Sequence, residues 1–504
     1  MPEPESNLLH ECLRQTGAAF PEAVAIIEEE RITLFGELLT QAEALAATFA
    51  ELGVRPGDRV ALVMPKTTEA IVAVFASLLA GAAYVPIQPR WPKERIATTL
   101  QDCQARLVVS ATDGPPRIAQ LDGREAVAWD EAVRPRQDRY HRYDGPQVQS
   151  TDPALFLFTS GSTGRPKGVV LSHGAVSVFV RWCVTQFGIS ANDRVASPSP
   201  LGFDLSTFDL FSMALCGAAC VLVPEHIVWM PRFVVQLLRQ TRITCWYSVP
   251  SILTGMLQEG GFADGDNACM RLVLFAGEVF ASANAVRLQA AVPDATCVNL
   301  YGPTETNVVS WYTLPPAIDT SQPIPIGKAC PYAELRLDES NGELLAAGQS
   351  LMTGYCNLPE ETALAFAMVE GKRYYRTGDR VTLGLTGDYT FVGRLDRQVK
   401  RRGFRIELGE IEAALGRHCS VVEAASVAVR TESHGTVVTV FIRTRAGEGL
   451  SAIEVKSYCA RALPSYMLPD RVVFVDAIPR GNRGKIDYEA LERTAGEPSH
   501  GHQT

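Results

Sequence analysis

Short apolar runs alternate with amphipathic stretches along most of the chain. The runs that are typical of buried strands are RVALVMP (59–65), ALFLF (154–158), CVLVP (220–224), TCWYSVP (244–250), RLVLFAG (271–277) and TCVNLYG (296–302). Strands that alternate with helices favour an α/β fold in which helices cover both faces of mainly parallel sheets. We therefore expect residues 1–395 to form a large N-terminal domain of parallel-rich sheets flanked by helices.

The longest apolar run, IVAVFASLLAGAAYVPI (71–87), predicts a buried helix that leads into a strand. It is shorter than the roughly 20 residues that a transmembrane helix needs. The run also contains Gly81 and Pro86, which are typical of a break between two elements. We therefore expect no membrane partner.

The pattern changes near residue 395, where RLDRQVKRRGFRIELGEIEAAL (394–415) is densely charged and then becomes an amphipathic helix. Strand-like VVEAASVAVR (421–430), TVVTVFIRT (436–444) and DRVVFVDAIP (470–479) follow, and helix-like IEVKSYCARAL (453–463) precedes the last of them. These elements predict a small C-terminal α+β domain over residues 396–504, with a hinge at Asp396.

Charge and cysteine usage narrow the class of protein. The net charge of −9 argues against a nucleic-acid partner, because phosphates bind to basic surfaces. The twelve cysteines are scattered and form no C-x-x-C pair. The first residues, MPEPESNLLHECL, are acidic and polar, unlike a signal peptide. We therefore expect reduced thiols and a cytoplasmic protein.

The segment FTSGSTGRPKGVVLSH (158–173) suits a polyphosphate. Its glycines allow tight turns that present several backbone N–H groups, and its hydroxyls and Lys167 add further donors. It is not a P-loop, which requires a Gly-Lys pair followed by Ser or Thr, and no such pair occurs in the chain.

Seven motifs, in order, resemble those of adenylate-forming enzymes, and most closely those of the amino-acid adenylation domains of nonribosomal peptide synthetases. They are YVPIQPRWP, LFTSGSTGRPKGVVLSH, NLYGPTETNVV, GELLAAGQSLMTGYCN, YRTGDRV, FVGRLDRQVKRRGFRIELGEIE and PRGNRGKID, and the resemblance extends from about residue 20 to 490. It implies that ATP activates an amino acid as an aminoacyl-AMP with release of pyrophosphate. The product is then transferred to the phosphopantetheine thiol of a carrier protein. Gln88 stands where the family commonly has Asp, and we assign it no role.

The resemblance also implies a role for individual residues in ATP binding. Tyr301 would stack on the adenine, Thr304 would contact the α-phosphate, and Glu305 would hold Mg²⁺. Asp379 and Arg394 would bind the ribose. The residues implied to hold the phosphates are Thr159, Ser160, Gly161, Ser162, Thr163, Gly164 and Lys167. The catalytic residues would be Lys485, Thr304 and Glu305, with the Lys485 ammonium bridging the substrate carboxylate and the α-phosphate.

In the second half-reaction of such enzymes, the small domain rotates about a hinge that corresponds to Asp396. The loop of Lys400, Arg402 and Gly403 then faces the active site. Arg401 departs from the family, which usually has an aliphatic residue at this position. Three consecutive cations could bind an acidic carrier surface or the pantetheine phosphate, or could be a solvated hinge.

The substrate pocket implied by the resemblance is apolar apart from one carboxylate and one phenol. Its residues are Asp204, Leu205, Phe208, Tyr247, Leu274, Ala276, Leu300, Val308 and Val309. Asp204 would accept hydrogen bonds from an ammonium group, and the remaining residues favour a compact aliphatic side chain. This set resembles the pockets of proline-activating domains, including free-standing ones that feed pyrrole biosynthesis. It does not separate proline from pipecolate, since one methylene is worth only about 1–3 kcal/mol.

Only 19 residues follow Lys485, and they contain no Gly-Gly-x-Ser motif for a phosphopantetheine arm. We therefore expect a separate peptidyl carrier protein that acts in trans. An acyl- or aryl-CoA ligase is the nearest alternative, although Asp204 argues against it. A D-alanyl carrier-protein ligase and a non-catalytic scaffold are less consistent with the pocket and with Lys485.

Overall fold

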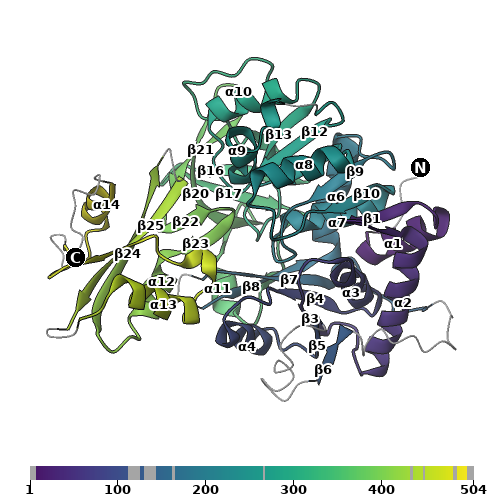
Figure 1. The fold of residues 1–504 in the computed structure, drawn as a ribbon, viewed down its shortest axis with the longest axis horizontal. Coiled ribbons are helices and arrows are strands. Elements are labelled where there is room, and N and C mark those ends of the chain that lie inside the picture. The colour runs from purple at the N-terminus through teal and green to yellow at the C-terminus, as the bar shows by residue number, and fades with distance from the viewer. Residues whose placement is uncertain are drawn as a thin grey trace. The chain divides into compact units, whose positions relative to one another are not determined.

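The computed structural model describes residues 7–111, 125–129, 143–161, 165–264, 267–431, 435–445, 449–480 and 485–496. The chain divides into two compact units (Figure 1). Unit 1 comprises Met1–Pro89, Leu100–Phe158 and Gly168–Leu395, and unit 2 comprises Arg90–Thr99, Thr159–Lys167 and Asp396–Thr504. The division differs from the expected one in that two short segments from the first 395 residues group with unit 2.

Unit 1 contains a nine-stranded sheet in the order β15-β14-β13-β12-β11-β9-β10-β1-β2. Its strands are β1 (Val24–Glu28), β2 (Arg31–Leu34), β9 (Arg194–Ser197), β10 (Ala219–Leu222), β11 (Cys245–Ser248), β12 (Leu272–Ala276), β13 (Thr296–Tyr301), β14 (Ser310–Thr313) and β15 (Lys328–Ala329). The neighbours from β1 to β13 are parallel, whereas β2, β14 and β15 are antiparallel. The central strands are mainly buried and mainly apolar, as parallel strands covered on both faces are.

A second, seven-stranded sheet has the order β18-β8-β7-β4-β3-β5-β6. Its strands are β3 (Arg59–Val63), β4 (Ala83–Ile87), β5 (Leu107–Ser110), β6 (Glu125–Ala128), β7 (Pro153–Thr159), β8 (Lys167–Ser172) and β18 (Gly354–Tyr355). Helix α3 (Thr68–Leu79) precedes β4, and every residue of α3 except Glu69 is buried. The prediction of a buried helix that leads into a strand is therefore confirmed.

The third sheet of unit 1 is antiparallel, with the order β16-β17-β20-β19 and with β21 paired to β20. Its strands are β16 (Ala333–Asp338), β17 (Glu343–Gly348), β19 (Phe366–Val369), β20 (Lys372–Leu383) and β21 (Tyr389–Arg394). The sequence pattern did not separate this sheet from the parallel ones. Strand β20 alternates buried and exposed positions, as a strand with one solvated face does.

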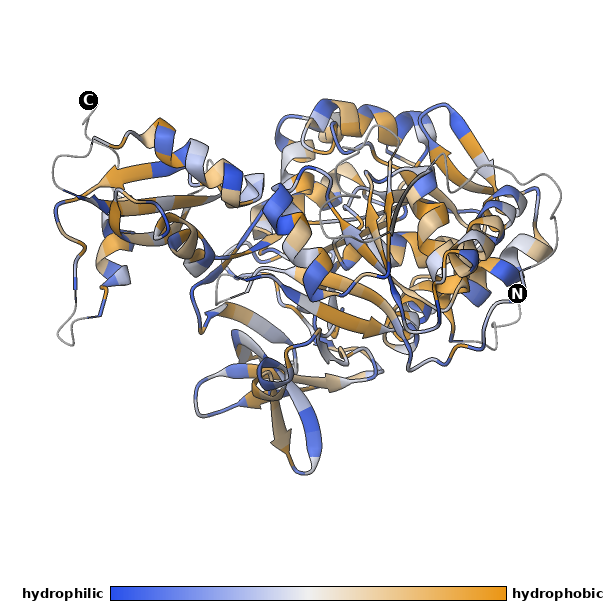
Figure 2. Ribbon diagram, turned by 90° about the horizontal axis from the view of Figure 1, so that it is seen from below, coloured by the Kyte–Doolittle hydropathy of each residue, from blue (hydrophilic) through white to orange (hydrophobic). Residues whose placement is uncertain are grey.

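The helices of unit 1 pack on the sheets with their apolar faces inward, and apolar residues concentrate in the strands (Figure 2). The helices besides α3 are α1 (Leu9–Ala19), α2 (Phe35–Glu51), α4 (Lys93–Asp102), α6 (His173–Gln186), α7 (Leu205–Cys216), α8 (Pro231–Thr241), α9 (Pro250–Gln258), α10 (Ser282–Ala291) and α11 (Pro359–Leu364). The first residues of α4 belong to unit 2. The parallel strands and flanking helices confirm the predicted α/β class.

Unit 2 follows the predicted order of elements after residue 395. They are β22 (Gln398–Arg401), β23 (Phe404–Glu407), α12 (Leu408–Leu415), β24 (Val421–Thr431), β25 (Gly435–Thr444), α13 (Ala452–Ala462), β26 (Arg471–Phe474) and α14 (Tyr488–Gly496). A buried ion pair between Arg95 and Glu410 joins the segment Arg90–Thr99 to α12. Ser160 Oγ donates to the carbonyl of Arg405 at 2.7 Å, which similarly joins the segment Thr159–Lys167 to β23.

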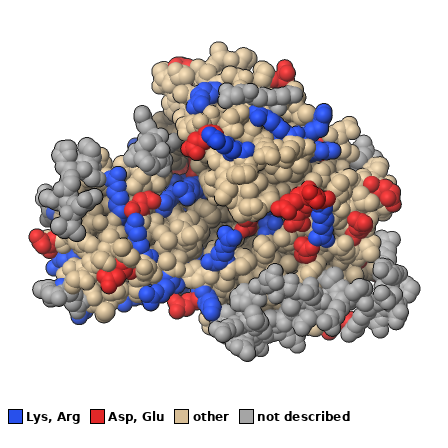
Figure 3. All heavy atoms as spheres, viewed as in Figure 1, with Lys and Arg blue, Asp and Glu red and all other residues tan. Residues whose placement is uncertain are grey.

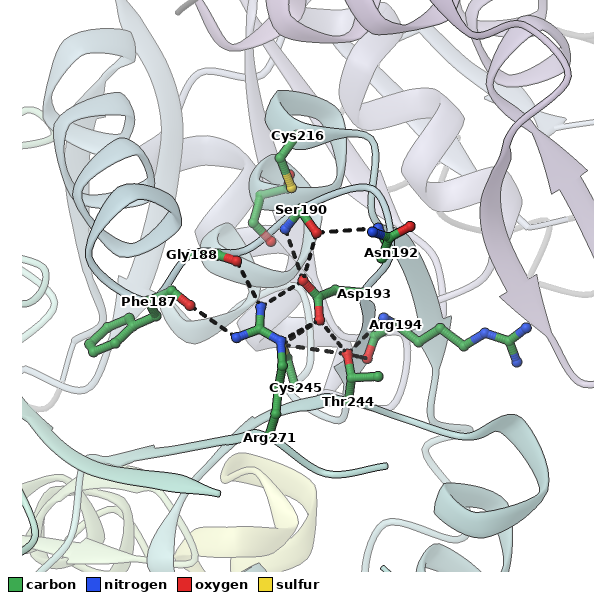
Figure 4. A network of polar contacts seen from close by, with 11 residues as sticks. Phe187, Gly188, Ser190, Asn192, Asp193, Arg194, Cys216, Thr244, Cys245 and Arg271 are labelled. Carbon is green, nitrogen blue, oxygen red and sulfur yellow. Dashed lines mark hydrogen bonds and ion pairs between the residues drawn. The ribbon is translucent and has the colours of Figure 1, made fainter. Parts of the chain in front are cut away.

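At the amino edge of the nine-stranded sheet, Asp193 holds three strand starts together (Figure 4). Its carboxylate accepts two hydrogen bonds from the Arg271 guanidinium, at 2.7 and 2.6 Å, and one from Thr244 Oγ1 at 2.7 Å. Arg271 Nη1 also donates to the carbonyl of Phe187 at 3.0 Å. The bidentate pair therefore links the residue before β9 to the residue before β12, and the Thr244 hydrogen bond links it to the residue before β11.

All twelve cysteines lie among the described residues, and none of them is paired in a disulfide. Within the described part of the chain, no helix is both long and apolar enough to cross a membrane. On the face drawn in Figure 3, Lys and Arg side chains are interspersed with Asp and Glu side chains.

Candidate functional site

The direction of the strand order in the nine-stranded sheet reverses next to β9. The chain passes from β9 through α7 to β10 on one side, and then through α8, α9 and α10 to β11, β12 and β13 on the other. Right-handed crossovers therefore place α7 on one face of the sheet and α8–α10 on the opposite face. In sheets of this kind, ligands bind at the carboxyl ends of the strands where the order reverses. That point lies between β9 and β11.

Four of the expected pocket residues lie on one face of this sheet. Tyr247 pairs in register with Leu274, and Ala276 pairs with Leu300. Leu274 and Ala276 are two positions apart on β12, so all four side chains point to the same side. Each of these side chains is buried.

Helix α7 contributes three more pocket residues on that same face. Asp204 caps its first turn by accepting from the backbone N–H of Leu205 at 3.0 Å. The ring of Phe208 meets the ring of Tyr247 edge to face, with centroids 5.5 Å apart. Burial raises the pKa of Tyr247 well above its usual value, and the nearby Asp204 carboxylate raises it further. Tyr247 is therefore a neutral phenol near the Asp204 carboxylate.

Val308 and Val309 do not share one environment. Val308 belongs to the same buried cluster as Tyr247 and Leu274. Val309 packs instead with Tyr301, Ile326 and neighbouring residues of the antiparallel sheet. The two adjacent valines therefore pack in different buried clusters.

The YGPTE segment forms a tight loop between β13 and β14. A Cβ on Gly302 would lie 1.7 Å from the carbonyl oxygen of Asn307, so only glycine fits this close approach. Thr304 is half-buried, whereas Glu305 is fully buried. Glu305 Oε1 accepts a hydrogen bond from the Tyr355 hydroxyl at 2.8 Å. The loop therefore holds a carboxylate in a fixed orientation.

Tyr301, Asp379 and Arg394 meet in one cluster. Asp379 and Arg394 are directly paired on β20 and β21, and Arg394 Nη1 lies 2.7 Å from Asp379 Oδ1. The Tyr301 hydroxyl donates to Asp379 Oδ2 at 2.5 Å. Burial, followed by the charge of Asp379, raises the pKa of Tyr301 well above its usual value. The structure thus brings together the three residues expected to contact adenine and ribose.

The residues expected to bind phosphate belong to unit 2. Thr159, Ser160, Gly161 and Lys167 are described, and Ser160 is buried. Ser162, Thr163 and Gly164 lie outside the described residues. A Cβ on Gly161 would lie 2.1 Å from the carbonyl oxygen of Arg165, so the turn requires glycine there.

The other expected residues of unit 2 lie near turns. Lys485 is exposed and directly precedes Ile486, which bridges to Arg480. Asp396 is exposed, and its Oδ1 accepts from the backbone N–H of Gln398 at 3.1 Å. Lys400 lies on β22, which forms a hairpin with β23. The two-residue turn of this hairpin is Arg402 and Gly403, with positive φ angles of 52° and 79°.

Arg401 has partners within unit 2 and is not solvated as one of its two expectations required. Its guanidinium donates to the carbonyls of Tyr466 and Leu468 at 3.2 and 3.0 Å and to Asp470 Oδ1 at 2.5 Å. The Arg401 side chain is only 14% exposed. Arg401 therefore ties β22 to the segment before β26 and is not a solvated side chain, while its binding to a carrier protein stays a prediction.

Two features near the expected site were not predicted, although the first of them lies in the motif GELLAAGQSLMTGYCN. One is Tyr355, whose contact with Glu305 bridges 50 positions of sequence. The other is a buried pair, Lys66 and Asp209. Lys66 Nζ donates to the carbonyls of Ser197 and Ser199, on the segment that leads to Asp204. Burial lowers the pKa of Lys66 and raises that of Asp209, so burial disfavours both charges.

A cavity of about 340 Å³ lies at the opposite, amino edge of the sheet. Its lining includes the first residues of three parallel strands, Val24, Arg194 and Ala219. None of the residues expected to contact ATP or the amino acid lines it.

Comparisons with known proteins agree with this arrangement. The AMP-binding enzyme family matches residues 13–356, and the AMP-binding enzyme C-terminal domain matches residues 410–485. An L-proline--[L-prolyl-carrier protein] ligase from Pseudomonas fluorescens is 36% identical, covering 97% of this chain and 99% of the relative. A ligase of the same name from Streptomyces coelicolor is 34% identical, covering 95% of each chain.

Among solved structures, the Vibrio cholerae adenylation domain AlmE in complex with glycyl-adenosine-5'-phosphate is 26% identical. It superposes with a TM-score of 0.82 over 98% of this chain and 99% of that chain. The order of the motifs, the two-unit fold and these matches agree, and the chain belongs to the AMP-binding enzyme family.

Proposed function

We propose that this chain activates L-proline with ATP, forms prolyl-AMP and releases pyrophosphate. The observation that carries the proposal is Asp204, a half-buried carboxylate at the start of α7 on an otherwise apolar, buried face. A carboxylate at this position would bind the ammonium group of an amino acid by charge-assisted hydrogen bonds. The names of the two ligases, which this chain covers almost end to end, support proline as the amino acid.

In the proposed first step, a carboxylate oxygen of proline attacks the α-phosphorus of ATP. The bond from that phosphorus to the bridging oxygen breaks, and pyrophosphate leaves with the electron pair. Thr159, Ser160, Gly161 and Lys167, with Ser162, Thr163 and Gly164, would hold the β- and γ-phosphates. Lys485 would stabilise the charge on the α-phosphate and on the attacking carboxylate, and Thr304 would contact the α-phosphate.

The nucleoside would bind at Tyr301, Asp379 and Arg394. The Tyr301 ring is fixed by the hydrogen bond from its hydroxyl to Asp379. The Asp379 carboxylate has further lone pairs with which it could accept ribose hydroxyls, because each oxygen offers about two. Arg394 holds that carboxylate from the other side. An adenine that stacks on Tyr301 would therefore bring its ribose to a fixed acceptor.

Glu305 suits one Mg²⁺ ion bound together with ATP. Mg²⁺ usually takes one or two carboxylates, and phosphate oxygens and water complete its shell. Glu305 is a buried carboxylate in the loop that carries Thr304. No cluster of three or more His, Cys, Asp or Glu residues suited to a metal occurs in the described part of the chain, and a one-carboxylate site needs none. The ion would neutralise phosphate charge during pyrophosphate release.

We propose a second step in which the thiol of a phosphopantetheine arm attacks the carbonyl carbon of prolyl-AMP. AMP leaves, and a thioester forms on a separate peptidyl carrier protein. The two relatives named as carrier-protein ligases support this step. Asp396 would be the hinge, and the hairpin turn at Arg402 and Gly403 would face the thiol, with Lys400 at its base. The pyrrole-type pathway that follows from the resemblance stays a prediction.

The test is amino-acid-dependent ATP–pyrophosphate exchange with the native chain and with Lys485→Ala. We expect exchange with L-proline well above all other amino acids, and a loss of at least about 100-fold in Lys485→Ala, as for removal of a group that stabilises transition-state charge. Lys456→Ala is the matched control, because Lys456 is also an exposed lysine of unit 2.

Exchange with another small apolar amino acid would keep the reaction and overturn proline. Thioester formation from an organic acid and CoA, without amino-acid exchange, would assign the chain to acyl-CoA ligases. A carrier-loading assay, read by the mass of the holo-carrier, tests the second step separately.

A further inference from the structure

Tyr355 lies where the chain returns from the antiparallel sheet to the edge of the seven-stranded one. Tyr355 is the second residue of the short strand β18, where it pairs with Val169 of β8. The flanking backbone is fixed on both sides, because Thr353 N–H donates to Val170 at 2.9 Å and Cys356 N–H donates to Gly168 at 2.8 Å. The position of the Tyr355 ring is therefore set by the sheet edge.

The same segment is bonded to the YGPTE loop twice. Met352 N–H donates to the carbonyl of Glu305 at 2.7 Å, and the Tyr355 hydroxyl donates to Glu305 Oε1 at 2.8 Å. One contact holds the Glu305 backbone and the other holds its carboxylate. Both come from a segment of four residues, so the backbone and the side chain of Glu305 are held by one rigid element.

The hydrogen bond has a specific effect on the carboxylate. Glu305 is fully buried, and a hydroxyl that donates to a buried carboxylate makes a strong, charge-assisted bond. Because one oxygen is engaged by a fixed donor, the plane of the carboxylate is also fixed. Groups that hold a metal-binding carboxylate in this way tune metal affinity although they do not touch the metal.

We propose that Tyr355 is a positioning residue that orients the Glu305 carboxylate for the Mg²⁺ of the ATP complex. The inference rests on the proposed function, because that function assigns Mg²⁺ to Glu305. Tyr355 itself contacts neither the metal nor ATP in this scheme. Loss of its hydroxyl should therefore weaken metal binding and leave amino-acid binding intact.

The neighbouring hydroxyl of Tyr375 provides a matched control. It lies 3.5 Å from the Tyr355 hydroxyl, which is at the limit of a hydrogen bond. Tyr375 is buried and Tyr355 is half-buried, and the Tyr375 ring packs edge to face on Phe366. Tyr375→Phe removes one hydroxyl from the same environment without removing the donor to Glu305.

The experiment measures binding of Mn²⁺ to the full chain in the presence of ATP, by electron paramagnetic resonance of the free ion. It also measures the Mg²⁺ concentration that gives half-maximal proline-dependent exchange. For Tyr355→Phe we expect the dissociation constant for Mn²⁺ and the half-maximal Mg²⁺ concentration each to rise about 10-fold or more. This is the range seen when an outer partner of a metal ligand is lost. The KM for proline should stay within about twofold, and Tyr375→Phe should leave all three values within about twofold.

Glu305→Gln completes a double-mutant cycle. If Tyr355 acts through Glu305, Tyr355→Phe should have no further effect on Mn²⁺ binding once Glu305 has been replaced. An equal effect in both backgrounds would overturn the proposal. So would a lower melting temperature of Tyr355→Phe with unchanged Mn²⁺ and Mg²⁺ values, which would show a merely structural role.

A wrong proposed function and a wrong role for Tyr355 would be seen in different measurements. A native chain without amino-acid exchange would refute that function. The Mn²⁺ titration with ATP needs no turnover, and it would still decide whether Tyr355 affects the metal through Glu305.

Discussion

The Tyr301 hydroxyl donates a hydrogen bond of 2.5 Å to Asp379 Oδ2, and so joins the strand before the YGPTE loop to the antiparallel sheet. Arg394 holds the other oxygen, Oδ1, at 2.7 Å. Asp379 is 1% exposed. A buried carboxylate with a donor on each oxygen is rigid, so the residue expected to bind the ribose is oriented before any ligand arrives.

Tyr301→Phe should weaken ATP binding while keeping the ring that would stack on adenine. A hydrogen bond to a charged group is worth about 1.5–3 kcal/mol, so we expect the KM for ATP to rise roughly 10-fold or more. The KM for proline should change less than about twofold. Exchange kinetics with each substrate varied in turn provide the measurement. Equal increases in both KM values would contradict the assignment.

Asp204→Asn should separate amino-acid recognition from folding. Asn caps a helix about as well as Asp does, so α7 should keep its stability. The charge that would pair with the proline ammonium is lost, and kcat/KM for proline should fall about 10- to 100-fold. The KM for ATP shows whether nucleotide binding is intact, and the melting temperature shows whether folding is intact. A melting temperature that falls in parallel with activity would mean that Asp204 acts mainly as a cap.

The elements that follow directly from the sequence are those with the strongest apolar patterns. The five runs that became β3, β10, β11, β12 and β13 are mainly buried on both faces, so most of their residues are apolar. Helix α3 is buried at every position except Glu69, so its apolar run is also nearly continuous. The antiparallel sheet was not separated, because β20 mixes charged and apolar residues and lies within motifs that attract a functional interpretation.

Residues of the candidate site were predicted where a motif carries them, and missed where a tertiary contact defines them. Arg401 donates a hydrogen bond to Asp470, which lies 69 residues away in the sequence, and no local pattern indicates that pairing. Tyr355 lies in the motif GELLAAGQSLMTGYCN and Lys66 lies outside all seven motifs, but the relevance of both comes only from the groups that they contact. Nor could the pattern tell that Val308 and Val309 face different clusters.

Asp193→Ala should destabilise unit 1 without changing the active site. It removes the carboxylate that binds Arg271 and Thr244 at the amino edge of the sheet. The Arg271 side chain is 38% exposed, so water can solvate it after the carboxylate is lost. We therefore expect the free energy of unfolding to fall by about 2 kcal/mol, less than the roughly 3–5 kcal/mol typical of a fully buried pair. Urea unfolding measures the change, and exposed Asp294→Ala is the matched control. A changed KM for ATP or proline would contradict the separation of the two edges.

A buried histidine pair should make stability depend on pH. His10 and His173 pack edge to face with ring centroids 5.4 Å apart. Burial, with a smaller effect of Arg14, lowers the pKa of His10 from 6.5 to about 4. Burial and then His10 lower the pKa of His173 to about 3. Both side chains are therefore neutral in the folded chain at pH 7.

Since the unfolded histidines take up protons near pH 6.5, the unfolded state binds more protons than the folded state below that pH. Stability should be greatest above pH 6.5 and fall towards pH 4, by up to about 1.4 kcal/mol per pH unit for each histidine. Urea midpoints at pH 7.5, 6.5 and 5.5 should show a smaller decline in His10→Leu than in the native chain. Exposed His226→Leu should leave the decline unchanged, and a decline equal in all three proteins would assign it to other groups.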